Sequence, residues 1–130
     1  MKYLFDASSI YAIVKAEKAQ LLILNCTCDL ARYEIGNILI TERHLRRTMT
    51  ETEQRSLLDL VGRSLKLMVT VGVSGFEQEV VDLAVKYNLS FYDAAYAFLA
   101  KKNNLAFVTE DGKLAKKIGA YVKVITALEI

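Results

Sequence analysis

The sequence of 130 residues contains no proline, no glycine- or serine-rich tract and no low-complexity run. Linkers between domains are typically built from such segments, so their absence predicts one domain over residues 1–130. No apolar run approaches the roughly 20 residues that cross a bilayer, and Asp6 interrupts the apolar stretch at the N-terminus. We therefore expect neither a membrane segment nor a secretory signal.

Cysteine, histidine and net charge are also scarce. Cys26 and Cys28 are two residues apart, a spacing that is geometrically poor for a disulfide bond, and no other cysteine is present. The single histidine, His44, lies far along the chain, so a Cys–His metal site is equally unsupported. We expect free thiols, buried or half-buried, and a cytoplasmic protein. A formal net charge of +2 does not by itself indicate a nucleic-acid partner.

Short apolar runs alternate with helical spacings along the whole chain. The apolar runs predict five strands, at 2–5, 21–25, 65–71, 105–109 and 121–125. Helical spacing predicts a helix after Asp6 and further helices at 29–45, 50–64, 74–87, 90–102 and 112–119. Capping-box spacings open three of them, at Thr50–Glu53, Ser74–Glu77 and Ser90–Asp93. Because parallel strands need long crossovers, the expected fold is an α/β three-layer α/β/α sandwich around a central, mainly parallel sheet of about five strands.

Three acidic residues fall at predicted strand ends or helix starts. Asp6 follows the first strand, Asp111 follows the fourth, and Asp93 lies in the first turn of its helix. In parallel α/β sheets, ligands bind beyond the carboxyl ends of the strands. The same positions also suit helix capping, which contributes about 1 kcal/mol per cap. The spacing alone leaves both roles open.

Glu34 is harder to explain as a capping residue. Leu30 and Ile38, four residues to either side, put it on an apolar stripe of its helix. An unpaired buried carboxylate is costly, so Glu34 needs a salt bridge, water at the helix edge or a polar cavity. Clustered acids would repel one another unless a cation neutralised them, and carboxylate oxygens suit Mg²⁺ or Mn²⁺. Such a site indicates metal-assisted phosphoryl transfer.

Four stretches of the chain resemble the motifs of the PIN-domain family. They are YLFDASSIYA (3–12), ARYEIGNIL (31–39), LSFYDAAYAFLA (89–100) and FVTEDGKLAKK (107–117), and they occur in family order over nearly the whole chain. The last two are specific when found together, whereas DASS alone is weak. The chain most resembles the VapC-type toxin ribonucleases of prokaryotic toxin–antitoxin pairs.

This resemblance implies a metal-dependent endoribonuclease. It implies ligation of Mg²⁺ or Mn²⁺ by four acids, Asp6, Glu34, Asp93 and Asp111. It also implies supporting roles for Ser8 and Thr109, which could equally be plain turn or cap hydroxyls. The family pattern Thr-x-Asp favours Asp111 over Glu110, which should point outward. The implied partners are an RNA substrate and a small antitoxin protein that lies across an apolar groove, and the implied assembly is a homodimer or a dimer of dimers.

Two basic clusters are candidates for RNA contacts, although either could be a solvated face. Lys113, Lys116 and Lys117 follow Asp111, and Arg43, Arg46 and Arg47 end the helix that carries Glu34. We favour the lysines because they are closer in sequence to a proposed ligand. Four tyrosines are interpreted as packing residues instead of a base-stacking platform: Tyr11, Tyr33, Tyr92 and Tyr96.

Other acidic α/β folds fit less well. A receiver domain would place a phosphoacceptor Asp at the end of its third strand, and LKLMVTVG contains none. A haloacid-dehalogenase-type phosphatase would need Asp-x-Asp after the first strand, but Ser8 occupies the second acidic position. The remaining alternative is a non-catalytic PIN-fold module that binds RNA or protein. Metal-dependent RNA turnover separates that module from an enzyme.

Overall fold

The computed structural model describes residues 1–130. Its five strands are β1 (Tyr3–Phe5), β2 (Cys26–Cys28), β3 (Val69–Val71), β4 (Ala106–Val108) and β5 (Val124–Ile125). Its six α-helices are α1 (Ala7–Lys15), α2 (Leu30–Ile40), α3 (Glu51–Lys66), α4 (Glu77–Tyr87), α5 (Phe91–Lys102) and α6 (Gly112–Ile118). Three shorter turns complete the chain: the 3₁₀-helices η1 (Ala19–Leu22) and η3 (Ala127–Glu129), and the π-helix η2 (Thr41–Leu45).

All five strands form one parallel sheet in the order β3-β2-β1-β4-β5. Leu4 of β1 pairs with Cys26 on one side and with Phe107 on the other. The chain therefore builds outward from β1 in one direction and then restarts in the opposite direction with β4. Asp6 and Asp111 consequently lie at the same edge of the sheet, as predicted from their places after β1 and β4.

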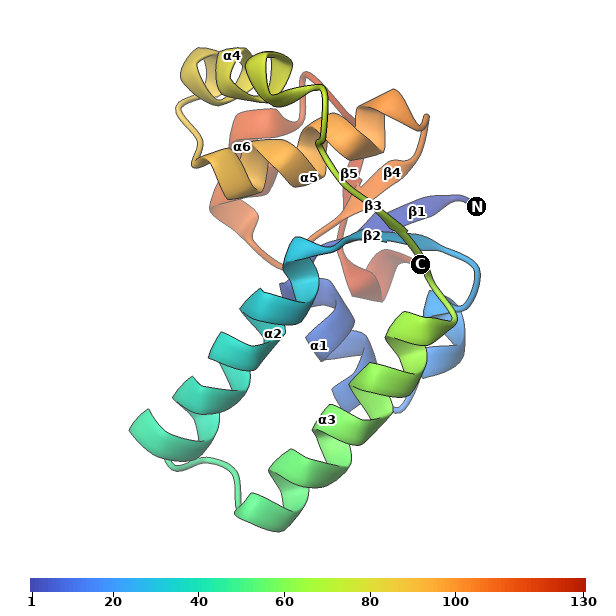
Figure 1. Cartoon of the computed structure of the whole chain (residues 1–130), viewed down its shortest axis with the longest axis vertical. Coiled ribbons are helices and arrows are strands. Elements are labelled where there is room, and N and C mark those ends of the chain that lie inside the picture. The colour runs from blue at the N-terminus through green and yellow to red at the C-terminus, as the bar shows by residue number, and fades with distance from the viewer.

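Helices cover both faces of the sheet (Figure 1). Successive strand residues point to opposite faces. Leu4 and Phe107 pack in a core cluster with residues of α4, α5 and α6, whereas Phe5 and Val108 pack in a second cluster with residues of α1, α2 and α3. Burial on both faces explains why the strands read as continuous apolar runs. The expected α/β/α arrangement is confirmed.

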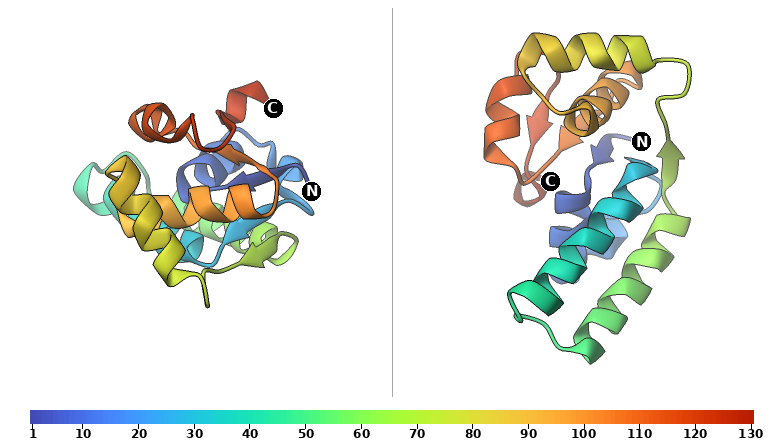
Figure 2. Two further views of the ribbon diagram at one scale, coloured as in Figure 1. Left: turned by 90° about the horizontal axis from the view of Figure 1, so that it is seen from above. Right: turned by 60° about the vertical axis from the view of Figure 1, so that its left-hand side comes forward.

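Helices α2 and α3 form a hairpin that extends away from the sheet (Figures 1 and 2). Thr50 caps α3 through the predicted capping box with Glu53, and both of its hydrogen bonds are 3.2 Å long. The equivalent prediction at Ser74 is wrong. Helix α4 begins after Phe76 without a side-chain cap, and the Glu77 carboxylate accepts a hydrogen bond from the Gly75 backbone N–H instead.

Three predicted strands shift or shorten along the chain, and the last of them, expected at 121–125, is reduced to β5. Residues 21–25 were expected to form a strand, but η1 ends at Leu22 and Leu24 adopts a left-handed conformation with φ 64°. Pairing with β1 begins only at Cys26. The predicted strand at 65–71 shortens to β3, because α3 continues through Lys66 and buries Leu65 in the core. Apolar letters alone do not distinguish a buried helix end from a strand.

Both cysteines are free and buried, as predicted. Burial raises the pKa of both thiols, that of Cys28 to about 12. A thiol with so high a pKa stays protonated near neutral pH and is a poor nucleophile or metal ligand. No helix of the protein combines the length and the apolarity that a bilayer span needs.

Candidate metal centre

A pocket of about 270 Å³ opens beside the carboxyl ends of β1 and β4, where the direction of strand addition reverses. Such reversal points leave a crevice above the sheet in which ligands bind. The pocket is lined by ten residues: Asp6, Ala7, Ser8, Glu34, Asn37, Ile38, Asp93, Tyr96, Asp111 and Leu114. All four predicted acids are among them, and lysine, arginine and histidine are absent from the lining. The arrangement gathers negative charge without a protein cation inside the pocket.

Asp6 is both the N-cap of α1 and part of this pocket. Its Oδ1 accepts hydrogen bonds from the backbone N–H of Ser9 (2.9 Å) and from the Ser8 hydroxyl (2.8 Å), and its Oδ2 accepts one from the Thr109 hydroxyl. Burial raises the pKa of Asp6, and these hydrogen bonds partly offset the rise. Capping and site formation are thus compatible roles for one carboxylate.

The two supporting hydroxyls connect the start of α1 to the loop after β4. Thr109 donates to Asp6 and accepts a hydrogen bond from the Asp111 backbone N–H at 3.2 Å. Ser8 also donates to Asp6 and accepts from the Glu110 backbone N–H at 3.2 Å. Each hydroxyl therefore uses both its donor and its acceptor, and together they fix the position of Asp6 relative to Asp111.

Glu34 reaches the pocket from α2 and is held by Tyr96 of α5. The Tyr96 side chain is buried, and its hydroxyl donates a 2.6 Å hydrogen bond to Glu34 Oε1. Partial burial raises the pKa of Glu34, and the charges of Asp6 and Asp93 raise it further. Glu34 makes no salt bridge, so the structure excludes that explanation for its place on an apolar stripe.

Asp93 and Asp111 face the same pocket from the starts of α5 and α6. The Ser90 hydroxyl caps α5 by accepting the Asp93 backbone N–H at 3.1 Å. Burial and the nearby Asp111 charge raise the pKa of Asp93, and Ser90 and Lys117 partly offset that rise. Asp111 caps α6 with Oδ1, which accepts from the backbone N–H groups of residues 113 and 114. Asp111 therefore has the capping role that its position suggested, whereas only the Ser90 half of the capping box predicted for Ser90 and Asp93 forms.

The donor chemistry of the pocket fits a hard divalent cation, because four carboxylates can supply oxygen ligands. As the side chains stand, however, no three His, Cys, Asp or Glu residues lie close enough together to hold one ion. Asp6, Glu34 and Asp111 are each held by their own hydrogen-bond partners, listed above. Shared ligation would require side-chain rotations that bring the carboxylates inward.

The sequence analysis did not identify two polar residues that line the pocket, Tyr96 and Asn37. Each lies three residues after a predicted acid on the same helix, and that spacing places side chains on one face. This signal could have found both.

Tyr33 and Tyr92 were expected to pack, but their exposed fractions are 75% and 57%, so this interpretation is wrong.

The structure separates Glu110 and the three lysines that follow β4 by their position relative to the carboxylate pocket. Glu110 points outward, as expected, and accepts a 2.7 Å hydrogen bond from the Ala127 backbone N–H. Lys113 and Lys117 line a smaller pocket that also contains Asp93 and Asp111. Lys116 is exposed but does not line that pocket, so the prediction of an RNA contact there gains no support from its position.

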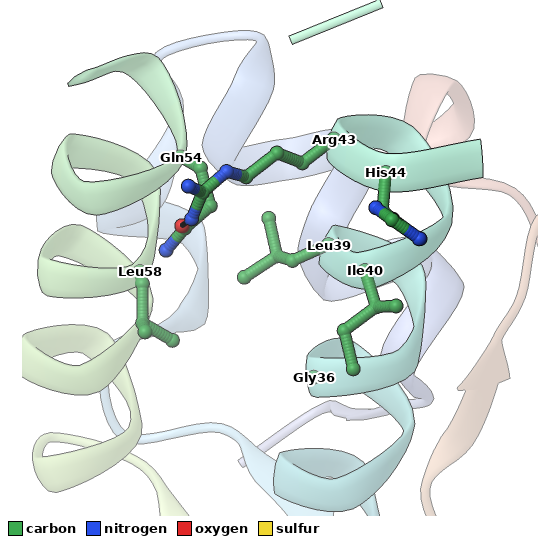
Figure 3. Close-up of a pocket in the computed structure, with 7 residues that line it drawn as sticks. All are labelled: Gly36, Leu39, Ile40, Arg43, His44, Gln54 and Leu58. Carbon is green, nitrogen blue, oxygen red and sulfur yellow. Dashed lines mark hydrogen bonds between the residues drawn. The ribbon is translucent and has the colours of Figure 1, made fainter. Parts of the chain in front are cut away.

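A separate pocket of about 510 Å³ lies between the α2–η2 segment and α3 (Figure 3). Leu39, Ile40 and Leu58 provide its apolar surface, and Arg43 donates a 2.7 Å hydrogen bond to Gln54 across it. His44 also lines this pocket, and none of the four acids does. The only histidine of the chain is therefore placed away from the carboxylates.

The sequence of the chain matches the model of the PIN domain over residues 3–119. The protein belongs to the PIN-domain family. Among its relatives is "Exonuclease VapC9" of Pyrobaculum aerophilum, 33% identical over 98% of this chain and 94% of the relative. "Ribonuclease VapC3" of the same organism is 32% identical over 94% of this chain and 98% of the relative. These full-length matches place this PIN domain in the VapC-type group.

A solved structure gives the same result for the fold. The crystal structure of PAE2754 from Pyrobaculum aerophilum superposes with a TM-score of 0.79 at 26% sequence identity. The similarity covers 99% of this chain and 91% of that one.

The raised pKa values of Asp6, Glu34 and Asp93 predict an unusual pH dependence of stability in the absence of divalent cations. The folded protein takes up these protons at higher pH than the unfolded chain, so the free energy of unfolding should increase as pH falls through the raised pKa values. Urea denaturation in EDTA at a series of pH values, from neutral down towards the ordinary carboxyl pKa, measures this. The increase should be smaller in Glu34→Gln and unchanged in Glu110→Gln. A stability that stays constant or falls over this window would contradict the prediction.

Proposed function

We propose that this PIN domain is a Mg²⁺- or Mn²⁺-dependent endoribonuclease and the toxin of a type II toxin–antitoxin pair. The observation that carries the proposal is the pocket at the β1–β4 reversal, which gathers four carboxylates without a cation in its lining. Hard oxygen donors in this arrangement suit a divalent metal ion. Two VapC-type relatives, one named a ribonuclease and one an exonuclease, support nuclease chemistry.

In this proposal, the metal ligands are Asp6, Glu34, Asp93 and Asp111. A bound divalent cation supplies Lewis acidity and lowers the pKa of water beside the phosphodiester. Ser8 and Thr109 keep Asp6 in place through the hydrogen bonds to its two oxygens. The Tyr96 hydroxyl orients Glu34 and keeps its Oε1 aimed at the pocket. These hydrogen bonds to the acids matter because the orientation of its ligands strongly affects the affinity for a metal ion.

The geometry also favours water over a protein side chain as the nucleophile. His44 lines a different pocket from the four acids. Cys26 and Cys28 are buried, and both thiols have raised pKa values. A water molecule would attack phosphorus, and the bond to the 3′ oxygen would break. The products would be a 3′-hydroxyl and a 5′-phosphate.

Replacement of single acids tests the ligand assignment. Asp93→Asn and Asp111→Asn should each lower Mg²⁺-dependent RNA cleavage by more than about 100-fold, the upper end of the loss from an outer-shell partner. In EDTA, Asp93→Asn should leave the free energy of unfolding unchanged or raise it, because one repelling charge disappears. Glu110→Gln is the matched control and should retain activity. If Asp93→Asn destabilises the fold by several kcal/mol yet cleaves normally, its role is capping alone.

Product analysis tests the mechanism. Cleavage should leave 5′-phosphate ends, proceed when the 2′-hydroxyl at the cleaved bond is removed, and stop in EDTA. His44→Ala and the double change Cys26→Ser, Cys28→Ser should remain active. Products that end in 2′,3′-cyclic phosphate, or cleavage that persists in chelator, would rule the mechanism out. RNA binding without any cleavage would favour the non-catalytic module.

The proposal includes a small antitoxin protein as partner and a homodimer or dimer of dimers as the assembly. The apolar pocket between α2 and α3 offers a surface for the antitoxin, since Ile40 and Leu58 remain 59% and 47% exposed. Leu58→Asp should therefore weaken co-purification with the antitoxin, whereas Leu128→Asp, at a residue that is 91% exposed, should not. Equal effects of both changes would place the antitoxin elsewhere. Light scattering of the free protein reports the assembly.

A further inference from the structure

Two further pockets adjoin the carboxylate pocket, and each shares lining residues with it. The first, of about 280 Å³, is lined by Asn37, Ile38, Thr41, Glu42 and Arg46. The second, of about 200 Å³, is lined by Asn88, Leu89, Ser90, Asp93, Asp111, Lys113, Leu114 and Lys117. Asn37 and Ile38 belong to both the first and the central pocket, and Asp93 and Asp111 belong to both the second and the central pocket. The three pockets are therefore parts of one continuous groove.

Charge changes sign twice along this groove. Arg46 lies at one end with its less exposed ion-pair partner Glu42, the four acids occupy the middle, and Lys113 and Lys117 lie at the other end. Cations that flank an acidic, cation-binding centre match a polyanion whose backbone crosses that centre. Basic residues at only one end of the groove would not match a polyanion that crosses the acidic centre.

The π-helix η2 explains how Arg46 reaches the groove. The Arg46 backbone N–H donates to the Thr41 carbonyl at 2.9 Å, a bond that spans five residues instead of four. Arg46 is thereby placed one turn beyond Thr41, where an uninterrupted α-helix would present Leu45. Leu45 is instead 70% exposed and does not line the groove. The extra residue in this turn exchanges an apolar side chain for a cation.

The cations at both ends are accessible to a ligand. The Arg46 side chain is 68% exposed, and its one ion pair, to Glu42, is long at 3.7 Å. At the opposite end, Lys117 Nζ donates a 2.9 Å hydrogen bond to the Asn88 carbonyl at the end of α4. This bond holds Lys117 at the rim of the groove, near Asp93 and Asp111. Lys113 is exposed beside it.

We propose that the RNA backbone follows this groove, with Arg46 and Asn37 binding it on one side of the central pocket and Lys113 and Lys117 on the other. The central pocket of about 270 Å³ continues into both flanking pockets through shared lining residues. Exposed cations at both ends let the strand enter and leave, so an internal segment fits. The proposal rests on the proposed ribonuclease function only for the chemistry at the centre of the groove.

Binding of a fluorescent single-stranded RNA oligonucleotide tests the path, measured by anisotropy in Mg²⁺ on the uncleaving Asp93→Asn background. Arg46→Ala and Lys117→Ala should each weaken binding about fivefold at about 0.1 M salt, because each single-strand phosphate contact contributes a slope of about 0.7 in log Kd against log salt. Matched controls are Arg32→Ala on α2 and Lys116→Ala on α6, which line none of the three pockets and should change Kd by less than about twofold. Arg46→Lys should retain the salt slope.

The outcome is decisive in either direction. If the controls weaken binding as much as Arg46→Ala and Lys117→Ala, or if these two variants bind normally, RNA does not follow this groove. A covalently closed circular RNA then tests passage of an internal segment with the unmodified protein: the circle should be cut. Cleavage of linear RNA but not of circles would overturn the path and the internal mode of cleavage, and would leave only metal-dependent RNA hydrolysis at the carboxylates standing. Site-dependent binding without cleavage would support the path and contradict the ribonuclease proposal.

Discussion

The repulsion among four carboxylates in one pocket is the constraint on which the rest of the structure depends. Burial and mutual charge raise the pKa values of Glu34 and Asp93, and burial raises that of Asp6. The protein tolerates this because most of these acids have local partners. Asp6 and Asp111 cap helices, and Glu34 accepts a hydrogen bond from Tyr96. The same bonds that stabilise the cation-free protein keep the acids apart, so closure around a metal ion would exchange hydrogen bonds for ligand bonds.

The parallel sheet makes this constraint possible. Because β4 is added beside β1, residues 103 positions apart in sequence, Asp6 and Thr109, come within hydrogen-bond distance. The helix starts at the same edge then bring Asp93 and Asp111 to the crevice. Glu34 is different, since it enters from the middle of α2 and depends on α5 for Tyr96. Its position is therefore sensitive to the packing of α2 against the rest of the domain.

Helix irregularity has a chemical consequence in this PIN domain. In a regular α-helix, Leu45 would bond to the Thr41 carbonyl and lie one turn beyond Thr41. The groove would then end on an apolar side chain. The π-turn puts Arg46 there instead. A π-turn is less favourable than regular α-helix, so its place at the end of the groove links a local backbone feature to charge complementarity. The Thr48 backbone N–H closes the turn by bonding the Glu42 carbonyl at 2.9 Å.

The sequence by itself predicted the alternation of strands and helices, the parallel sheet, the free cysteines and four acids that line one pocket, Asp6, Glu34, Asp93 and Asp111. These features depend on local periodicity, capping chemistry and motif spacing, which are written in neighbouring residues. Only the tertiary structure decided where the second strand begins, that Tyr96 holds Glu34, and that Arg46 rather than Lys116 lines the groove. Sequence distance was misleading for the basic residues. Lys116 is close to Asp111 in sequence but does not line the groove, whereas Arg46, twelve positions from Glu34, is brought to it by the π-turn. Such choices depend on contacts between distant segments and on hydrogen bonds that span one extra residue, and neither leaves a periodic signal in the sequence.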